Sequence, residues 1–301
     1  MVPILAALSR KVISLGFSVT QKKAISAASF CSKTFRNYKM LRSRIIPCLL
    51  IQNGGLVKTV QFKNPKYVGD PINAVRIFNE KHADELVVLD ISATKEKRSP
   101  DFRLIEKLAS ECRMPLCYGG GITTLEEAKV LINLGVEKVA LGAAVFDNPD
   151  LISEISMVLG NQSVVCVLDV RKKRGLFSAS YEFVTHNGTF THKAKISEVI
   201  EDIQSRGAGE VIINSVDSDG CMQGYDLSLV NSLKPFIKVP ATFLGGCGSI
   251  EDISKLIKLW GTVGAAAGSF FVFKGKYKAV LISYLSVEER LGLNLSNLTG
   301  E

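Results

Sequence analysis

The sequence has few of the residues that build metal centres and disulfide frameworks. Its 301 residues include three histidines and seven cysteines, and no two of these cysteines form a CxxC pair. An odd number of scattered cysteines is typical of reduced thiols inside a cell, and three histidines offer little material for a zinc site. The GxGxxG fingerprint of dinucleotide-binding folds is also missing. We therefore expect a cytoplasmic protein with no metal and no organic cofactor.

Long apolar runs and a general excess of one charge are missing as well. No stretch approaches the roughly 18 apolar residues that a membrane-spanning helix needs. Of the 37 Lys and Arg, seven lie in residues 1–39, which hold no acidic residue, so 30 remain against 29 Asp and Glu in the rest of the chain. This balance argues against the basic surface of a nucleic-acid-binding protein. We expect neither nucleic acid nor a membrane as a partner.

Residues 1–39 form a basic leader rich in Ser and Ala. This composition resembles an organelle transit peptide. A translation start placed too early, with Met40 as the true first residue, is the other interpretation, and both stay open. We expect residues 40–301 to form one domain.

Short β-branched apolar runs alternate with amphipathic stretches through this domain. The predicted strands lie near residues 44–51, 85–91, 115–118, 137–141, 163–170, 210–214, 239–244 and 263–267. Helical patterns between them, such as 125–135, 197–207 and 251–261, each end in a glycine suited to a helix C-terminus. Eight strand–helix alternations predict an α/β fold, a parallel sheet closed into a (βα)8 TIM barrel.

An internal repeat indicates that the barrel consists of two similar halves. ADELVVLDIS at 83–92 aligns with AGEVIINSVD at 208–217, and the same offset of 125 places Gly120 and Gly121 on Gly245 and Gly246. GVEKVALGAA at 135–144 aligns with GTVGAAAGSF at 261–270. A doubly wound sheet is the alternative fold, but it lacks its glycine fingerprint here.

The repeated glycines follow strands whose carboxyl ends should meet at the active-site face of a barrel. Glycines allow the backbone to approach an anion, and the N–H groups of the following helix start carry partial positive charge. Two such cradles predict a ligand with a phosphate at each end. The candidate residues are Gly120, Gly121 and Gly142 in one half, and Gly245, Gly246, Gly268 and Ser269 in the other. The alternative is that these glycines only make tight turns.

Carboxylates at the predicted strand ends are candidates for proton transfer. Asp169 follows the fifth strand and is the strongest general acid or base candidate. Asp90 and Asp217 are further strand-end carboxylates, and many such residues only cap the next loop. Asp219 and Gly220, after the sixth strand, are candidate ligand-binding residues. Lys58, in the glycine-bearing loop NGGLVKTVQF, could fold over a phosphate or remain solvated.

A series of motifs in fixed order resembles the cyclase subunit (HisF) family of imidazole glycerol phosphate synthase. The motifs are RIIPCL, GDP, DELVVLDI, PLCYGGGI, NPDLI, GAGE, DGCMQGYDL and the Gly-Gly pair after the seventh strand, between about residue 40 and residue 285. The resemblance implies a glutaminase partner at the amino-terminal face of the barrel and ammonia passing through it. It also implies a gate of alternating charges, which here would be Arg44, Glu85, Lys138 and Glu210. Such a ring would equally serve as a salt-bridge layer that closes the barrel floor.

The chain departs from this family pattern at residues that carry the cyclase chemistry. Cyclases of the family use two aspartates, after the first and fifth strands; the second matches Asp169, and the first falls on Leu50. The Asn-Thr pair that the family carries after the fourth strand is replaced by Gly142 and Ala143. Residues 186–195 also differ from the family's loop after the fifth strand.

These departures resemble a paralogous branch that carries IPCLL at the first strand. Residues 53–71 and 271–282 look closer to that branch than to the cyclase. It is associated with glutamine-dependent amidation of surface-polysaccharide sugars, in which the barrel passes ammonia to a separate amidotransferase. A functional cyclase of histidine biosynthesis and a scaffold that only activates the glutaminase are the alternatives.

Overall fold

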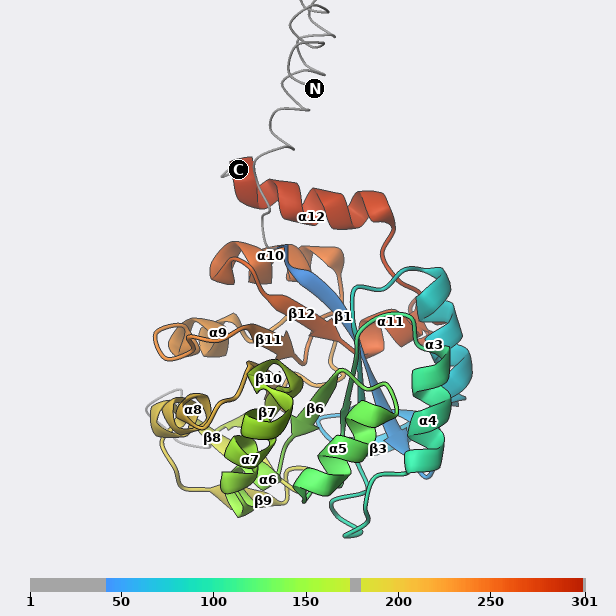
Figure 1. Ribbon diagram of the computed structural model, residues 1–301. Coiled ribbons are helices and arrows are strands. Elements are labelled where there is room, and N and C mark those ends of the chain that lie inside the picture. The colour runs from blue at the N-terminus through green and yellow to red at the C-terminus, as the bar shows by residue number, and fades with distance from the viewer. Residues whose placement is uncertain (1–41, 174–179, 300–301) are drawn as a thin grey trace, which may run out of the picture. The chain divides into compact units, whose positions relative to one another are not determined.

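The computed structural model describes residues 42–173 and 180–299, and the leader 1–39 lies outside the described residues. Eight parallel strands close into a barrel (Figure 1). The strands are β1 (Arg44–Gln52), β4 (Leu86–Asp90), β5 (Leu116–Gly119), β6 (Lys138–Leu141), β7 (Val164–Lys172), β10 (Glu210–Ser215), β11 (Ala241–Leu244) and β12 (Gly264–Ala267). The last strand pairs with the first, from Arg44 beside Gly264 to Pro47 beside Ala267. The predicted (βα)8 fold is confirmed, and all eight predicted runs form its strands.

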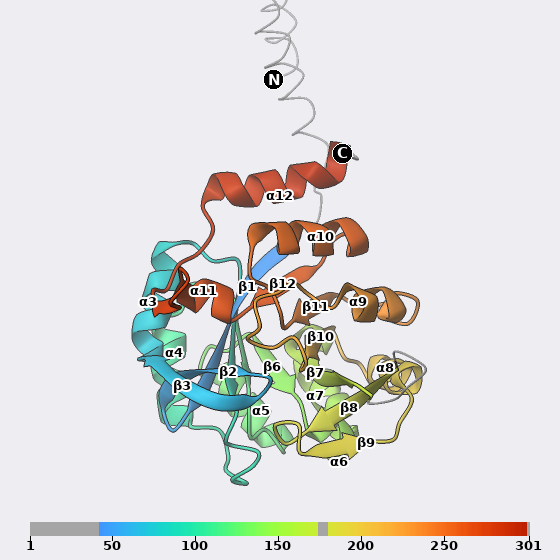
Figure 2. The same cartoon turned by 180° about the vertical axis from the view of Figure 1, so that it is seen from behind.

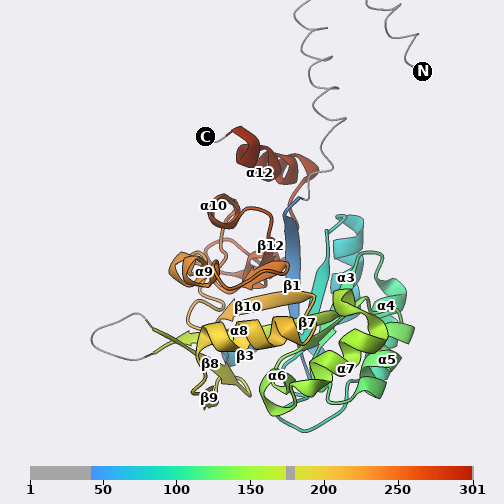
Figure 3. The same ribbon diagram turned by 60° about the vertical axis from the view of Figure 1, so that its left-hand side comes forward.

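Helices surround the barrel between these strands. They are α3 (Pro71–Glu80), α4 (Phe102–Glu111), α5 (Leu125–Asn133), α6 (Ala144–Asp147), α7 (Asp150–Leu159), η1 (Asn161–Ser163), α8 (Ile196–Ser205), α9 (Leu227–Leu233), α10 (Ile250–Trp260) and α11 (Ser269–Val272). The helix α12 (Val287–Thr299) packs beside α10 (Figures 1 and 3). Within the described part of the chain, no helix is both long enough and apolar enough to span a membrane.

The two half-barrels share the way in which their helices begin. Thr124 caps α5 and pairs with Glu127 in a capping box, and Ser249 caps α10 in the same way with Asp252. Both pairs are separated by the offset of 125 that relates the repeated glycines. Capping boxes satisfy backbone N–H groups that have no partner inside the helix. The half-barrel repeat therefore extends from the strands to the helix caps.

Two antiparallel hairpins extend from the carboxyl ends of repeat-related strands, and the sequence pattern did not predict them. The hairpin of β2 (Gly55–Val60) and β3 (Lys63–Gly69) follows β1. The hairpin of β8 (Tyr181–Thr185) and β9 (Phe190–His192) follows β7. Both lie at the same end of the barrel (Figure 2). A short pair, β13 (Phe273–Lys274) and β14 (Ala279–Val280), follows α11.

Side chains alternate between two separate cores along each strand, as the pleat requires. The larger cluster fills the space between strands and helices. The smaller one fills the barrel interior with Ile46, Cys48, Val87, Cys117, Ala140, Val165, Val167, Ile212, Leu244 and Ala266. Leu50 and Leu89 pack on this inner cluster toward the carboxyl ends of the strands. The barrel is thus packed with small and branched side chains below an open upper end.

Candidate functional site

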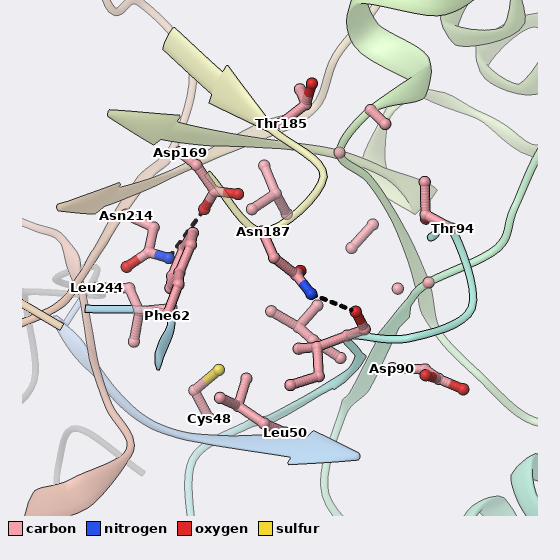
Figure 4. A pocket seen from close by; sticks show the side chains of 18 of the residues that line it. Cys48, Leu50, Phe62, Asp90, Thr94, Asp169, Thr185, Asn187, Asn214 and Leu244 are labelled. Atoms are coloured by element: carbon pink, nitrogen blue, oxygen red, sulfur yellow. Dashed lines mark hydrogen bonds between the residues drawn. The ribbon is translucent and has the colours of Figure 1, made fainter. Parts of the chain in front are cut away.

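A cavity of about 240 Å³ opens at the carboxyl ends of the strands, where barrel active sites lie (Figure 4). Every parallel strand, or the loop that follows it, contributes to its wall. Most of the predicted site residues line it together: Lys58, Gly120, Gly121, Gly142, Asp169, Asp219, Gly220, Gly245, Gly246, Gly268 and Ser269. Within residues 42–173 and 180–299, no group of three or more His, Cys, Asp or Glu side chains could hold a metal ion.

Asp169 stands in the cavity wall near the end of β7. Its Oδ1 accepts a hydrogen bond of 2.9 Å from Asn214 Nδ2 on the neighbouring strand β10. Desolvation raises the pKa of Asp169 to about 7, an effect that the Asn214 bond reduces and the nearby charge of Asp219 increases. A carboxyl group with a pKa near neutrality can both accept and donate a proton, as general acid–base catalysis requires.

Leu50 lines the same cavity, on the opposite side from Asp169 (Figure 4). It is placed by β1, where it pairs in register with Leu89 of β4. Asp90, at the end of β4, does not replace the missing carboxylate. Its Oδ1 accepts bonds from Ser92 and from the Ala93 N–H, and its Oδ2 accepts one of 3.1 Å from Arg98. Asp90 therefore caps its loop, which was one of the two interpretations of strand-end carboxylates.

Lys58 reaches into the cavity from β2 and is buried there. Its Nζ donates a hydrogen bond of 2.6 Å to the carbonyl oxygen of Cys48. Desolvation lowers the pKa of Lys58, against the attraction of Asp219. The solvated alternative is wrong for this lysine, because the β2–β3 hairpin holds its ammonium group at the cavity wall.

Asp219 ties the β2–β3 hairpin to the loop that follows β10. Its Oδ2 accepts a bond of 2.8 Å from Thr59 Oγ1, and its carbonyl accepts one of 2.9 Å from the Gln61 N–H. Burial raises the pKa of Asp219, although the Thr59 bond and the charge of Lys58 oppose this rise. Gly220 leaves room for the same hairpin, since a Cβ there would lie 2.1 Å from the Thr59 carbonyl oxygen. These contacts hold the hairpin over the cavity.

Steric surroundings divide the predicted phosphate-cradle glycines into two kinds. A Cβ on Gly120 would lie 2.5 Å from the Asp90 carbonyl oxygen, and one on Gly246 would lie 2.0 Å from that of Gly224. Gly121 and Gly245 are equally crowded by backbone, and all four have positive φ angles. Turn geometry alone is therefore sufficient to require these four glycines. A Cβ on Gly142 would meet nothing within 4 Å, so this glycine leaves space that the protein itself does not fill.

The four predicted gate residues form a closed ring at the amino-terminal end of the barrel. Arg44 bonds to Glu85 and lies 2.7 Å from Glu210, and Lys138 lies 2.7 Å from Glu85 and 2.9 Å from Glu210. Thr242 Oγ1 donates a further bond of 2.6 Å to Glu210. Burial opposes the charged forms of Lys138 and Glu210, but the facing charges outweigh it, raising the pKa of Lys138 and lowering that of Glu210. The ring pairs two basic with two acidic side chains and lies directly below the apolar interior.

Three of the cavity residues that were not found from the sequence are Phe62, Asn187 and Asn214. Phe62, at the tip of the β2–β3 hairpin, and Asn187, at the tip of the β8–β9 hairpin, are separated by the repeat offset of 125 and both have positive φ angles. Asn187 Nδ2 donates a bond of 3.0 Å to the carbonyl oxygen of Ile91. Asn214 is the third, and the aligned repeat segments could have revealed it, because it stands at the strand-end position of AGEVIINSVD.

Comparison with known proteins relates this chain to one family. The family described as "Histidine biosynthesis protein" matches residues 44–278. A Vibrio vulnificus (strain YJ016) protein, provisionally named imidazole glycerol phosphate synthase subunit hisF3, is 55% identical over 255 residues, which cover 85% of this chain and 97% of that protein. A Leptospira interrogans protein with the provisional name imidazole glycerol phosphate synthase subunit HisF is 51% identical, covering 84% and 99%. The imidazole glycerol phosphate synthase subunit HisF of Exiguobacterium sibiricum is 39% identical, covering 77% and 91%.

Proposed function

This chain belongs to the histidine biosynthesis protein family, and on that premise we propose that it is the barrel subunit of a glutamine amidotransferase complex. In this role it receives ammonia from a glutaminase bound at the amino-terminal face. The observation that carries the proposal is the closed ring of Arg44, Glu85, Lys138 and Glu210. Well-packed apolar residues would close a barrel floor at no greater energetic cost than buried ion pairs. Charged pairs that can exchange partners instead support a gate for a small polar molecule.

We infer that the ammonia serves amidation of a nucleotide sugar for surface polysaccharide, through a separate sugar amidotransferase. Leu50 supports this form of the function, because leucine offers no proton where a ring-closing enzyme would use a second acid or base. Asp90 and Asp219 are both engaged by neighbouring loops and so supply no substitute. A phosphorylated ligand would occupy the cavity above Asp169.

The second candidate is a cyclase that makes imidazole glycerol phosphate and aminoimidazole carboxamide ribotide. Asp169, with its pKa of about 7, supports it, and the similar proteins carry names of the synthase to which such a cyclase belongs. The cavity, with a poised carboxyl group and a buried lysine, argues against a third role as a scaffold without a ligand.

Association with the cognate glutaminase tests the proposal. The full chain mixed with this partner should give a one-to-one complex in gel filtration and raise glutamine turnover. The complex should then convert a nucleotide sugar when the sugar amidotransferase is added, whereas conversion of the ribonucleotide of the histidine pathway would favour the cyclase. No association at micromolar concentrations would contradict both the amidation role and the cyclase role.

A further inference from the structure

Two hairpins beside the cavity carry a patch of lysines that have no carboxylate partners. We call it the two-hairpin patch; its lysines lie on β3 and on the β13–β14 hairpin and are Lys63, Lys66, Lys274, Lys276 and Lys278. All five are exposed, and none of them forms an ion pair with another residue of the described part of the chain. The sequence has no acidic residue from 53 to 69 or from 253 to 287. The positive charges of the two-hairpin patch are therefore available to another molecule.

The two hairpins adjoin each other and border the mouth of the cavity. Lys66 Nζ lies 5.6 Å from the centre of the Phe273 ring, a cation–π contact that joins β3 to β13. Phe62, at the tip of the β2–β3 hairpin, lines the cavity, as does Ser269, which begins α11 four residues before β13. Figure 2 shows β3 and α11 on the same side of the barrel. A molecule bound to the two-hairpin patch would therefore lie beside the mouth of the cavity.

Aromatic side chains are exposed among these lysines. Tyr277 stands between Lys276 and Lys278 in the turn of the β13–β14 hairpin and is 91% exposed, and Tyr67 of β3 is 67% exposed. Lysines on an edge strand such as β3 can serve only to prevent pairing with another strand. Exposed tyrosines do not serve that purpose, and tyrosine is enriched in protein–protein interfaces. The two-hairpin patch therefore has the composition of a docking surface.

The distribution of charge favours an acidic protein over a nucleic acid or an anionic membrane. Without the five lysines of the patch, residues 40–301 hold 25 Lys and Arg against 29 Asp and Glu. The rest of the domain is thus slightly acidic and would repel a polyanion that extended beyond the patch. An acidic face on a protein can match the patch alone.

We propose that the two-hairpin patch docks an acidic face of the amidotransferase that consumes the ammonia. This inference rests on the proposed function as an ammonia-passing barrel. Ammonia that escapes into water is protonated to ammonium, which has no lone pair for attack, so the receiving enzyme has to lie over the mouth of the cavity. The patch borders that mouth and leaves the amino-terminal face free for the glutaminase, so both enzymes can bind at the same time.

Calorimetric titration of the cognate sugar amidotransferase into the complex of the full chain with its glutaminase tests the docking surface. The double variant Lys276→Glu/Lys278→Glu should weaken the affinity at least about tenfold, because it places like charges opposite each other. Tyr277→Ser should weaken it as well. Lys107→Glu/Lys255→Glu makes the same change of charge at exposed positions of α4 and α10 and is the matched control, which should bind as the wild type does. Equal affinity in the wild type and in Lys276→Glu/Lys278→Glu would overturn the proposal.

Measurements on the wild-type chain make the test independent of whether the variants fold. Its affinity for the amidotransferase should fall as sodium chloride rises from about 50 to 300 mM, since salt screens exposed charges. An affinity that does not change with salt would overturn the proposed match of charges. Binding to duplex DNA or to vesicles of anionic phospholipid that the double variant abolishes, with unchanged affinity for the amidotransferase, would assign the patch to a polyanion instead.

Product formation separates the docking surface from the proposed function. At concentrations where only the wild-type assembly forms, Lys276→Glu/Lys278→Glu should slow amidation of the nucleotide sugar several-fold with glutamine as the nitrogen source. With ammonium chloride the rate should equal that of the wild type, because ammonia then reaches the amidotransferase from solution. Glutamine-driven amidation that is equal in the wild type and the double variant would refute the docking surface and leave the proposed function intact. No association of the wild-type complex with the amidotransferase would refute both.

Discussion

The ammonium group of Lys58 lies against the backbone of Gly268, so that a Cβ at Gly268 would fall 2.5 Å from Nζ. The same Nζ is bonded to the Cys48 carbonyl oxygen, which fixes the cation between β1 and the end of β12. Gly142 occupies the equivalent position in the other half-barrel, where a Cβ would meet open space. Two glycines related by the repeat therefore have different physical reasons to be glycine.

The same substitution at these two positions should have different effects. Gly268→Ala should displace Lys58 and destabilise the fold by about 1 kcal/mol, at the low end of overpacking costs because a lysine side chain can yield. Gly142→Ala should leave the melting temperature unchanged and reduce affinity for a bisphosphorylated ligand, because the added methyl group occupies ligand space. Calorimetric titration and thermal melting of both variants check this. Equal ligand affinity in the wild-type chain and Gly142→Ala would show that the open space is not used.

The charged ring should contribute to stability much more than an ion pair on the surface. Lys138→Met leaves Glu85 and Glu210, which are almost fully buried, with one cation between them. Removing one partner of a buried pair costs roughly 3–5 kcal/mol, and the partial exposure of Lys138 reduces this to about 2–3 kcal/mol. Lys129→Met breaks an exposed pair with Glu126 and should cost less than about 1 kcal/mol. Denaturant unfolding of both variants measures the difference, and equal costs would show that the ring is not a buried network.

Strand positions could be predicted from the sequence, but the hairpins could not. Runs such as RIIPCLLI are apolar throughout because both faces of a barrel strand are buried, and this gives a strong signal. The turn of the β2–β3 hairpin consists of Gln61 and Phe62, both at positive φ, where Asn-Gly would be the usual signal. Two bulky residues held in this strained conformation give no turn signature.

Site residues whose role follows from their chemical type could be predicted from the sequence. Site residues whose role depends on their contacts were harder to predict. Asp169 could be found because a carboxylate at a strand end is a candidate for proton transfer, whereas the four ring charges were expected from the family resemblance. Whether a glycine is required by a neighbouring carbonyl, as Gly246 is, or leaves ligand space, as Gly142 does, depends on loops distant in the sequence. The repeat alignment could have drawn attention to Asn214, but its bond to Asp169 depends on the pairing of β10 with β7 and is visible only in the structure.

Protonation of Asp169 should make stability depend on pH. Its folded-state pKa of about 7 lies above the ordinary value of 3.8, so the folded state holds its proton more tightly than the unfolded state. The resulting stabilisation is complete below about pH 4 and is lost as pH rises through about 7. At about 1.4 kcal/mol per pKa unit the upper bound is about 4 kcal/mol, which water in the open cavity reduces.

Asp169→Asn removes this dependence and provides the measurement. The melting temperature of the variant minus that of the wild-type chain should increase as pH rises from 4 to 8. Asp70→Asn, at the exposed cap of α3, is the control for the loss of one carboxylate from the chain. A constant difference for Asp169→Asn would show that this carboxyl group titrates near its ordinary value.

Replacement of Leu50 tests whether one proton donor separates this chain from a cyclase. With leucine in place, turnover of the histidine-pathway ribonucleotide with ammonium should be undetectable, since general acid–base assistance contributes about 10²–10⁴-fold. Leu50→Asp should raise this turnover if Asp169 and Lys58 are otherwise competent. Leu50→Asn should not, because asparagine matches the shape of aspartate but carries no titratable proton.

The carboxyl group introduced by Leu50→Asp faces an apolar neighbour in Leu89, so its pKa should rise and its charged form should destabilise the barrel. Melting temperatures of all three proteins therefore accompany the rates. Substantial cyclase activity in the unmodified chain would contradict the amidation role, whereas activity that appears only with aspartate would show that the remaining machinery is intact.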